Sequence, residues 1–165
     1  MNLPLRRQNA QENLQTLMDA YFVKRERITC QNEGCNQQLG MTTEERLVDP
    51  KSAIVVNINR QFVNPNWKQA PRNQSHRFAG VKNNRRLALP NTVQVPKSGG
   101  GSFTYELVAA IEHSSEHTAG GHYIAHLKYN GEWFTANDDN PLRKSASYRD
   151  YHPEKSSIFL LRKQN

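Results

Sequence analysis

Residues 102–140 read SFTYELVAAIEHSSEHTAGGHYIAHLKYNGEWFTANDDN. The dipeptide Asn130-Gly131 separates two segments in which apolar and polar residues alternate, a pattern that predicts a tight β-hairpin. A two-residue turn fixes the pairing of the two strands. The expected opposite pairs are Tyr129 with Glu132, Leu127 with Phe134 and Ala125 with Ala136.

Side chains alternate between the two faces of a strand, so this register also sorts the hairpin into two faces. One face is apolar and is expected to lie against a core; it carries Tyr123, Ala125, Leu127, Phe134 and Ala136. The other face is polar and carries His122, His126, Lys128, Thr135 and Asn137.

His122 and Asn137 form a diagonal pair on the polar face, about 7–8 Å apart at the backbone, a span that side chains can bridge. A histidine beside a carboxamide or carboxylate, reached through the Gly120-Gly121 turn, is two-thirds of a hydrolytic triad. On the same register Asp138 points to the opposite face and Asp139 lies directly opposite His122. A β-bulge would reassign these positions, so both alternatives remain open.

Composition limits the class of protein. A chain of 165 residues is one domain or part of one. Its 36% hydrophobic content and mean hydropathy of −0.85 indicate a polar but globular chain. The net charge of +7 favours acidic partners. We expect no membrane segment, because no apolar run approaches ~18–20 residues, and no secretory leader. Two cysteines without a disulfide framework predict an intracellular location, in the cytoplasm or the nucleus.

Several other segments have a recognisable pattern. Residues 9–22 carry apolar residues at helical spacing, with Asn9 as the expected N-cap and Glu12 completing a capping box. Leu3-Pro4-Leu5 is typical of the end of a strand, with partners expected upstream. The β-branched run 53–58 predicts a central strand and 157–161 a closing strand. Many strands and one helix predict an antiparallel-rich α+β fold.

The stretch 51–105 contains no acidic residue. Six basic residues cluster in its middle: Lys68, Arg72, Arg77, Lys82, Arg85 and Arg86. One interpretation is a solvated loop with a basic bias. The other is a contact surface, within 68–86, for an acidic protein or a nucleic acid.

Several segments, which follow one another along the chain in the family's own order, resemble the ubiquitin-specific protease family, the papain-like cysteine deubiquitinases. TYELVAAIEHSSEHTAGGHYIAHLKYNGEWFTANDD is similar to the family's histidine box, and SSIFLLRK is similar to its last strand. Upstream, ITCQNEGC and VDPKSAIVVNINRQF resemble the second cysteine knuckle of the "fingers" and the strand after it. NLPLRRQNAQENLQTLMDAYF resembles the strand and helix before that knuckle.

The resemblance implies that residues 1–165 are the C-terminal part of one protease domain, of the α+β, antiparallel-sheet-rich fingers and palm type. Residues 1–50 would belong to the fingers and 51–165 to the palm, with 64–100 as a basic variable insertion. The reaction implied is thiol-dependent hydrolysis of the bond after ubiquitin's C-terminal glycine, and the partner implied is ubiquitin or a ubiquitinated protein.

The resemblance also implies roles for individual residues. His122 matches the general base, Asn137 the residue that orients its imidazole, and Asp138 a supporting residue. Gly120, Gly121 and Tyr123 match positions beside the substrate, where glycines let its backbone pass close to the histidine.

The family's cysteine box, with its nucleophile, has no counterpart in these 165 residues. Cys30 and Cys35 fall on the knuckle, spaced Cys-x4-Cys where the family usually has Cys-x2-Cys. Two thiols are half of the four ligands of a structural zinc ion, so the implied zinc site is incomplete and no other cofactor is expected. We therefore expect this chain alone to be inactive. Two alternatives remain: a catalytically inactive ubiquitin-binding or scaffold module, and a basic domain that contacts nucleic acid.

Overall fold

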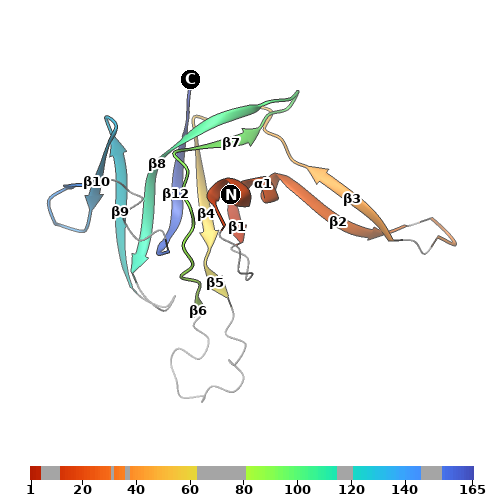
Figure 1. The fold of residues 1–165 in the computed structure, drawn as a ribbon, viewed down its shortest axis with the longest axis horizontal. Coiled ribbons are helices and arrows are strands. Elements are labelled where there is room, and N and C mark those ends of the chain that lie inside the picture. Colours follow the sequence, from red (N-terminus) through yellow and green to blue (C-terminus); the bar gives the residue numbers. More distant parts are fainter. Residues whose placement is uncertain (5–11, 31, 36–37, 63–80, 115–120, 146–153) are drawn as a thin grey trace, which may run out of the picture.

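The computed structural model describes residues 1–4, 12–30, 32–35, 38–62, 81–114, 121–145 and 154–165. Its centre is an eight-stranded sheet in the order β1-β4-β12-β8-β9-β10-β11, with β7 paired to β8 beside this path (Figure 1). Its strands are β1 Asn2–Pro4, β4 Ala53–Asn59, β7 Thr92–Pro96, β8 Ser102–Ser114, β9 His122–Tyr129, β10 Glu132–Ala136, β11 Arg143–Ser145 and β12 Ser156–Lys163. All of its ladders are antiparallel except β1 with β4.

Three further elements complete the described part of the chain. The helix α1 spans Leu14–Phe22, and two small sheets pair β2 Val23–Thr29 with β3 Gln38–Glu44 and β5 Gln61–Phe62 with β6 Val81–Lys82. The antiparallel-rich α+β prediction is confirmed, as is the closing strand β12; the strand predicted over 53–58 is also present as β4, but it lies next to the edge strand β1 and not at the centre of the sheet.

The core lies between α1 and one face of the large sheet. The apolar residues of α1 recur at helical spacing, and Leu14, Leu17, Met18 and Phe22 are all buried against the sheet. The sheet contributes β-branched and large apolar side chains: Val56, Ile58, Val93, Val95, Tyr105, Leu107, Phe159 and Leu161. Of the predicted basic insertion 64–100, Leu87, Leu89, Val93 and Val95 therefore belong to the core, whereas 64–80 lie outside the described residues.

The start of the helix differs from the prediction. The cap is Asn13, whose side chain accepts a hydrogen bond from the backbone N–H of Thr16 at 2.7 Å. The assignment of the N-cap to Asn9 was wrong, because the helix begins only at Leu14 and Asn9 itself lies outside the described residues. Both positions are asparagines with polar neighbours, so local pattern alone does not separate them.

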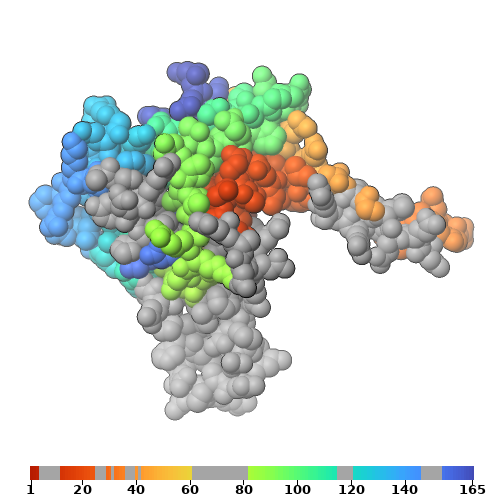
Figure 2. Space-filling model, viewed as in Figure 1, coloured from red at the N-terminus to blue at the C-terminus, as the bar shows by residue number. Residues whose placement is uncertain are grey.

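The first strand is where the sequence predicted it, and among the described residues it pairs with β4, downstream in the chain. Asn2 pairs in parallel with Asn57 of β4, and the amino group of Met1 donates to the Val55 carbonyl oxygen at 3.1 Å. Residues 2–4 and α1 thus belong with the large sheet, while the β2–β3 hairpin projects from the body of the molecule as an arm (Figures 1 and 2). The division into fingers 1–50 and palm 51–165 stays a prediction.

The β9–β10 hairpin has the predicted register, with Tyr129 opposite Glu132, Leu127 opposite Phe134 and Ala125 opposite Ala136. Its turn residues Asn130 and Gly131 have φ of 48° and 82°, as a type I′ turn requires.

The predicted orientation of the hairpin was wrong. Tyr123 and Leu127, on the face expected to be buried, are 61% and 42% exposed, whereas His126 on the polar face is 2% exposed. The polar face turns inward because its groups are hydrogen-bonded to one another and because Trp133 packs against the core. Across the sheet, the outer row Val55–Leu160–Ala109–Leu127–Phe134 is an apolar surface.

Among the described residues no helix is long and apolar enough to cross a membrane.

Candidate active site

His122 is the first residue of β9, and Asn137 directly follows the last residue of β10. The β9–β10 ladder ends at the pair Ala125–Ala136, so both side chains extend beyond it. The His122 ring nitrogen Nε2 is hydrogen-bonded to Oδ1 of Asn137. An amide oxygen only accepts, so Nε2 carries the proton and Nδ1 of the neutral ring keeps its lone pair.

Asp138 approaches the other ring nitrogen. Its Oδ2 lies 3.6 Å from Nδ1 of His122, which is too long for a hydrogen bond but close enough to attract a protonated ring. The register had placed Asp138 on the opposite face, and that prediction was wrong. Asp138 has φ of 48°, a left-handed conformation that ends the alternation of faces after Asn137. The rival Asp139 is not paired opposite His122, because the ladder ends three residues earlier.

A cleft of about 440 Å³ lies at one end of β8 and β9, where it is lined by His113 and by Tyr123, the residue that follows His122. Tyr123 and His113 form one side of it, with ring centroids 4.6 Å apart. No acidic residue lines the described part of the cleft. Its polar lining includes the amides of Asn2, Asn57 and Asn59 and the cations of Arg60 and Lys82.

Arg60 and Lys82 are buried cations that hold backbone carbonyls around this cleft. The guanidinium of Arg60 donates to the carbonyl oxygens of Ser156 at 2.6 Å, Arg85 at 2.8 Å and Asn83 at 3.0 Å. The ammonium of Lys82 donates to the His113 carbonyl oxygen. Burial, and next the positive charge of Arg60, lower the pKa of Lys82. The described lining of the cleft is therefore polar and positively charged, and it reaches Tyr123, next to His122 in the chain.

The structural role of Arg60 and Lys82 was not predicted from the sequence. Lys82 was read as part of a basic surface, yet it is 7% exposed and is used inside the fold. The sequence does carry one signal of this role. Residues 51–105 contain no carboxylate that could pair with Arg60 or Lys82, and these two side chains donate hydrogen bonds to backbone carbonyl oxygens.

The predicted glycines and basic residues are only partly described. Gly121 is exposed with φ of 146°, a conformation that favours glycine, whereas Gly120 lies outside the described residues. Of the basic segment 68–86, Lys68, Arg72 and Arg77 also lie outside them. Arg86 is exposed, with Nε 3.9 Å from a carboxylate oxygen of Glu154. A contact of this segment with a nucleic acid or an acidic protein stays a prediction.

Cys30 and Cys35 flank the tip of the β2–β3 hairpin, where the Cys35 amide donates to the Asn32 carbonyl oxygen at 3.0 Å. This hairpin extends away from β9, so neither thiol approaches His122 (Figure 1). Among the described residues no three metal-binding side chains cluster. Two thiols do not fill the tetrahedral set of a structural zinc ion, so the described residues do not fit that metal.

Comparisons with known proteins identify the family and the fold. The family model described as ubiquitin carboxyl-terminal hydrolase matches residues 3–160. The chain belongs to the ubiquitin carboxyl-terminal hydrolase family. Members of this family that resemble it include rat ubiquitin carboxyl-terminal hydrolase 48, 28% identical over 125 residues, which are 72% of this chain and 11% of the rat protein. Human ubiquitin carboxyl-terminal hydrolase 13 is 49% identical over 43 residues, 26% of this chain and 5% of the human protein.

Solved structures of deubiquitinase modules share the fold. The SAGA Ubp8/Sgf11/Sus1/Sgf73 module bound to ubiquitin aldehyde matches with a TM-score of 0.71 at 18% identity, covering 99% of this chain and 35% of that one. The Ubp8(C146A) form of the module bound to monoubiquitin matches with a TM-score of 0.71 at 19% identity, with the same coverage. This member of the hydrolase family thus spans about a third of the solved chains and only 11% and 5% of the two curated relatives.

Proposed function

We propose that this chain supplies the general base and its orienting residues for thiol-dependent hydrolysis of the bond after ubiquitin's C-terminal glycine. The observation that carries the proposal is the His122 ring held between Asn137 and Asp138. With Nε2–H donated to Asn137, Nδ1 is the atom that takes the proton of a thiol. Asp138 favours the imidazolium that forms, which then gives its proton to the leaving amine.

The nucleophile of this reaction is neither of the two cysteines of the chain. Cys30 and Cys35 lie on the projecting β2–β3 hairpin, away from His122 (Figure 1). In this proposal the thiol comes from a segment outside residues 1–165, and the chain by itself binds substrate without turning it over.

The cleft lined by His113 and Tyr123 is the proposed path of the substrate's tail. A tail that ends in glycines has no side chains to hold its backbone away from the exposed Gly121 and Tyr123. Its carbonyl oxygens would meet the cationic and amide groups of the cleft. Gly120 is proposed to share this role. The ubiquitin-bound structures with the same fold support ubiquitin as the partner. An intracellular location, cytoplasmic or nuclear, goes with that partner.

A second candidate is an inactive ubiquitin-binding module. It is favoured by the position of both cysteines, since within residues 1–165 no thiol lies near the base. The two candidates differ in the role of His122 once a thiol is supplied. In the first, His122 is required for hydrolysis; in the second, its replacement has no effect.

The first experiment is an assay of the purified chain with a fluorogenic substrate attached to the ubiquitin C-terminus. We expect no turnover. Turnover that disappears in Cys30→Ser or Cys35→Ser would contradict the assignment of these residues to the hairpin and not to the active site.

The second experiment is an NMR titration with ubiquitin. We expect amide shifts around Gly121, Tyr123 and the cleft, weaker binding in Tyr123→Ala and retained binding in His122→Ala. The matched control is Tyr129→Ala, because Tyr129 is a tyrosine of the same strand and face, 70% exposed, at the far end from the cleft. Equal loss of affinity in both tyrosine variants, or no shifts at all, would contradict the proposed substrate path.

A further inference from the structure

A chain of buried polar side chains crosses four strands of the sheet next to the candidate active site. Nε2 of His126 lies 3.3 Å from Oε2 of Glu112, and Nδ1 lies 3.2 Å from Oγ1 of Thr135. Oγ1 of Thr135 lies 2.8 Å from Oγ of Ser145. Glu112, His126 and Ser145 are 4%, 2% and 6% exposed, and Thr135 between them is half-buried, so most of the chain is shielded from water.

The hydrogen bonds of this chain have a definite direction. Oε2 of an ionised Glu112 accepts from Nε2–H of His126, so in the neutral ring Nδ1 accepts the Thr135 hydroxyl proton. Oγ1 of Thr135 then accepts from the Ser145 hydroxyl. This direction depends on Glu112, because its carboxylate fixes the tautomer of His126 and so leaves Nδ1 as the acceptor for Thr135. Glu112 also attracts the ammonium of Lys82, whose other charged neighbours are Arg60 and Lys155.

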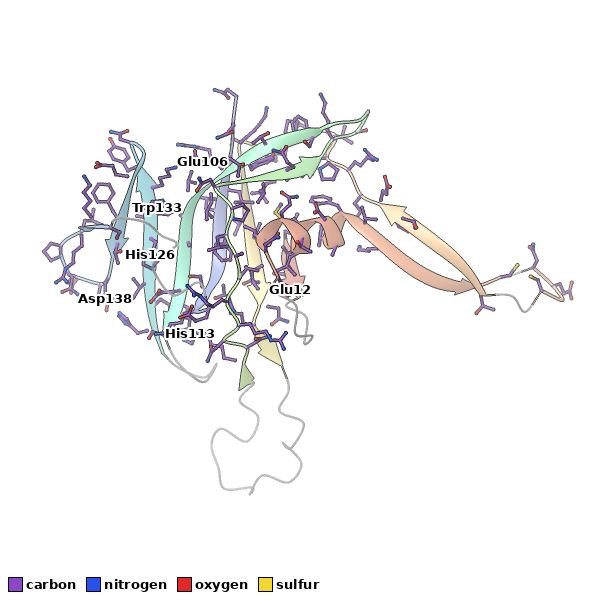
Figure 3. The ribbon with its side chains drawn as sticks, in the orientation of Figure 1. Glu12, Glu106, His113, His126, Trp133 and Asp138 are labelled. Atoms are coloured by element: carbon purple, nitrogen blue, oxygen red, sulfur yellow. The ribbon has the colours of Figure 1, made fainter. Side chains whose placement is uncertain are left out.

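The two hydroxyls hold both ends of the loop that carries Asn137 and Asp138. Thr135 lies two residues before Asn137 on β10, and Ser145 is the last residue of β11, the strand that follows the loop. Inside the loop, the backbone and side-chain amides of Asn140 donate to the Asn137 carbonyl oxygen at 3.1 and 2.8 Å. Figure 3 shows Asp138 on this loop at the edge of the molecule and His126 on the strand beside it.

The last rows of the β9–β10 ladder are Thr135–His126 and Ala136–Ala125. Of these two rows, only Thr135–His126 joins the strands through side chains as well as backbone. Beyond them, Asn137 and Asp138 have no strand partner to hold them in place.

We propose that Glu112 and His126 are positioning residues, which through Thr135 and Ser145 hold the 137–142 loop so that Asn137 and Asp138 stay against the His122 ring. This inference deepens the proposed function and rests on it for its biological meaning. The geometric claim is independent of hydrolysis, because it concerns the His122–Asn137 contact in the chain as it is.

The test is the ring-nitrogen spectrum of His122 in the ¹⁵N-labelled chain, recorded at pH 8, above the ordinary histidine pKa of about 6.5. A ring locked by Asn137 gives two well-separated nitrogen signals, while a ring released from it averages its tautomers. We expect Thr135→Val, which removes the hydroxyl at nearly constant shape, and Glu112→Gln to move the two signals toward each other. Thr135→Ser is expected to restore them.

The matched control is Glu106→Gln, which removes another ion-paired carboxylate of β8 outside the buried chain. It is expected to lower the unfolding temperature without moving the His122 signals. If Thr135→Val and Glu112→Gln lower the unfolding temperature and leave the His122 signals in place, the network only stabilises the sheet and the proposal fails. If Glu112→Gln does not fold, Ser145→Ala decides, because it cuts the chain at β11 and keeps the buried Glu112–His126 pair.

Loss of ubiquitin binding or of any hydrolytic role would refute the proposed function without touching these ring signals. Unchanged ring signals would refute the positioning role while ubiquitin binding stayed intact. The two failures are therefore distinguishable.

Discussion

At the scale of single residues, Glu106 is the carboxylate on which two cations of the sheet converge. Lys128 lies 2.7 Å from one of its oxygens and Arg162 3.0 Å from the other. The hydrogen bond from Lys128 lowers the pKa of Glu106 most, and Arg162 adds to this against the opposing effect of burial. The folded state therefore binds the Glu106 proton less tightly than the unfolded chain, whose glutamate pKa is about 4.3.

The consequence for stability depends on pH. A lowered folded-state pKa contributes stability that is complete above the unfolded pKa and is lost as the pH falls through the folded one. We expect Glu106→Gln to lower the free energy of unfolding by about 1 kcal/mol at pH 7, since Arg162 is largely exposed and adds little. The difference from wild type should shrink below about pH 4 in urea unfolding experiments. An equal difference at pH 7 and pH 3 would show that charge is not the source.

Asp138 shows why a residue can be found in the sequence and still be misplaced. Strand alternation predicts where its side chain points only while the strand continues, and the strand ends at Ala136. The left-handed φ of Asp138 depends on the loop that follows, which no periodic pattern describes. Asn137 could be placed correctly because it lies one residue closer to the ladder.

At the scale of elements, the β9–β10 turn was the most predictable feature, because its geometry demands residues that tolerate positive φ. Gly131 has φ of 82° and no atom within 4 Å of the place where a Cβ would be. Gly131→Ala should therefore cost about 1 kcal/mol through backbone strain alone. The control is Gly40→Ala in β3, where space is equally open and φ is not in the left-handed range. Thermal unfolding of both variants checks this; equal effects would contradict it.

The stability of helix α1 depends on its packing and its N-cap more than on its length. With nine residues α1 is too short to be stable by propensity, and packing of its apolar face holds it on the sheet. Asn13→Ala removes the bond to the Thr16 amide and should lower the free energy of unfolding by about 1 kcal/mol. Asn13→Ser should restore most of it. A substitution that is neutral in chemical denaturation would show that another group satisfies that amide.

At the scale of the whole molecule, the sheet has one face on the core and one apolar face on the outside. The outer row includes Val55, Leu160 and Leu127, which are 55%, 36% and 42% exposed. Amphipathic alternation in the sequence identified the two faces of the hairpin correctly but not which of them faces inward. A buried polar face is possible only when its groups bond to each other, and the Glu112–His126–Thr135–Ser145 contacts come from residues far apart in the chain.

The outer row should make the isolated chain bind apolar dyes and self-associate. We expect Leu127→Ser combined with Leu160→Ser to reduce dye fluorescence and the apparent mass in sedimentation. The cost in stability should be small because both side chains are part-exposed. Leu161→Ser, at a fully buried neighbour, is the contrasting variant and should destabilise the chain by about 3 kcal/mol. Unchanged sedimentation in the double variant would mean that this face does not mediate association.

The position of β12 between β4 and β8 has a consequence for synthesis on the ribosome. Of the described strands, β12 is the last to be made, yet it joins the β1–β4 edge to the remainder of the sheet. Until residues 156–163 leave the exit tunnel, β4 has no antiparallel neighbour, and the core between α1 and the sheet is open along its middle. The nascent chain must therefore wait with apolar strands exposed, a state in which chaperone binding competes with aggregation.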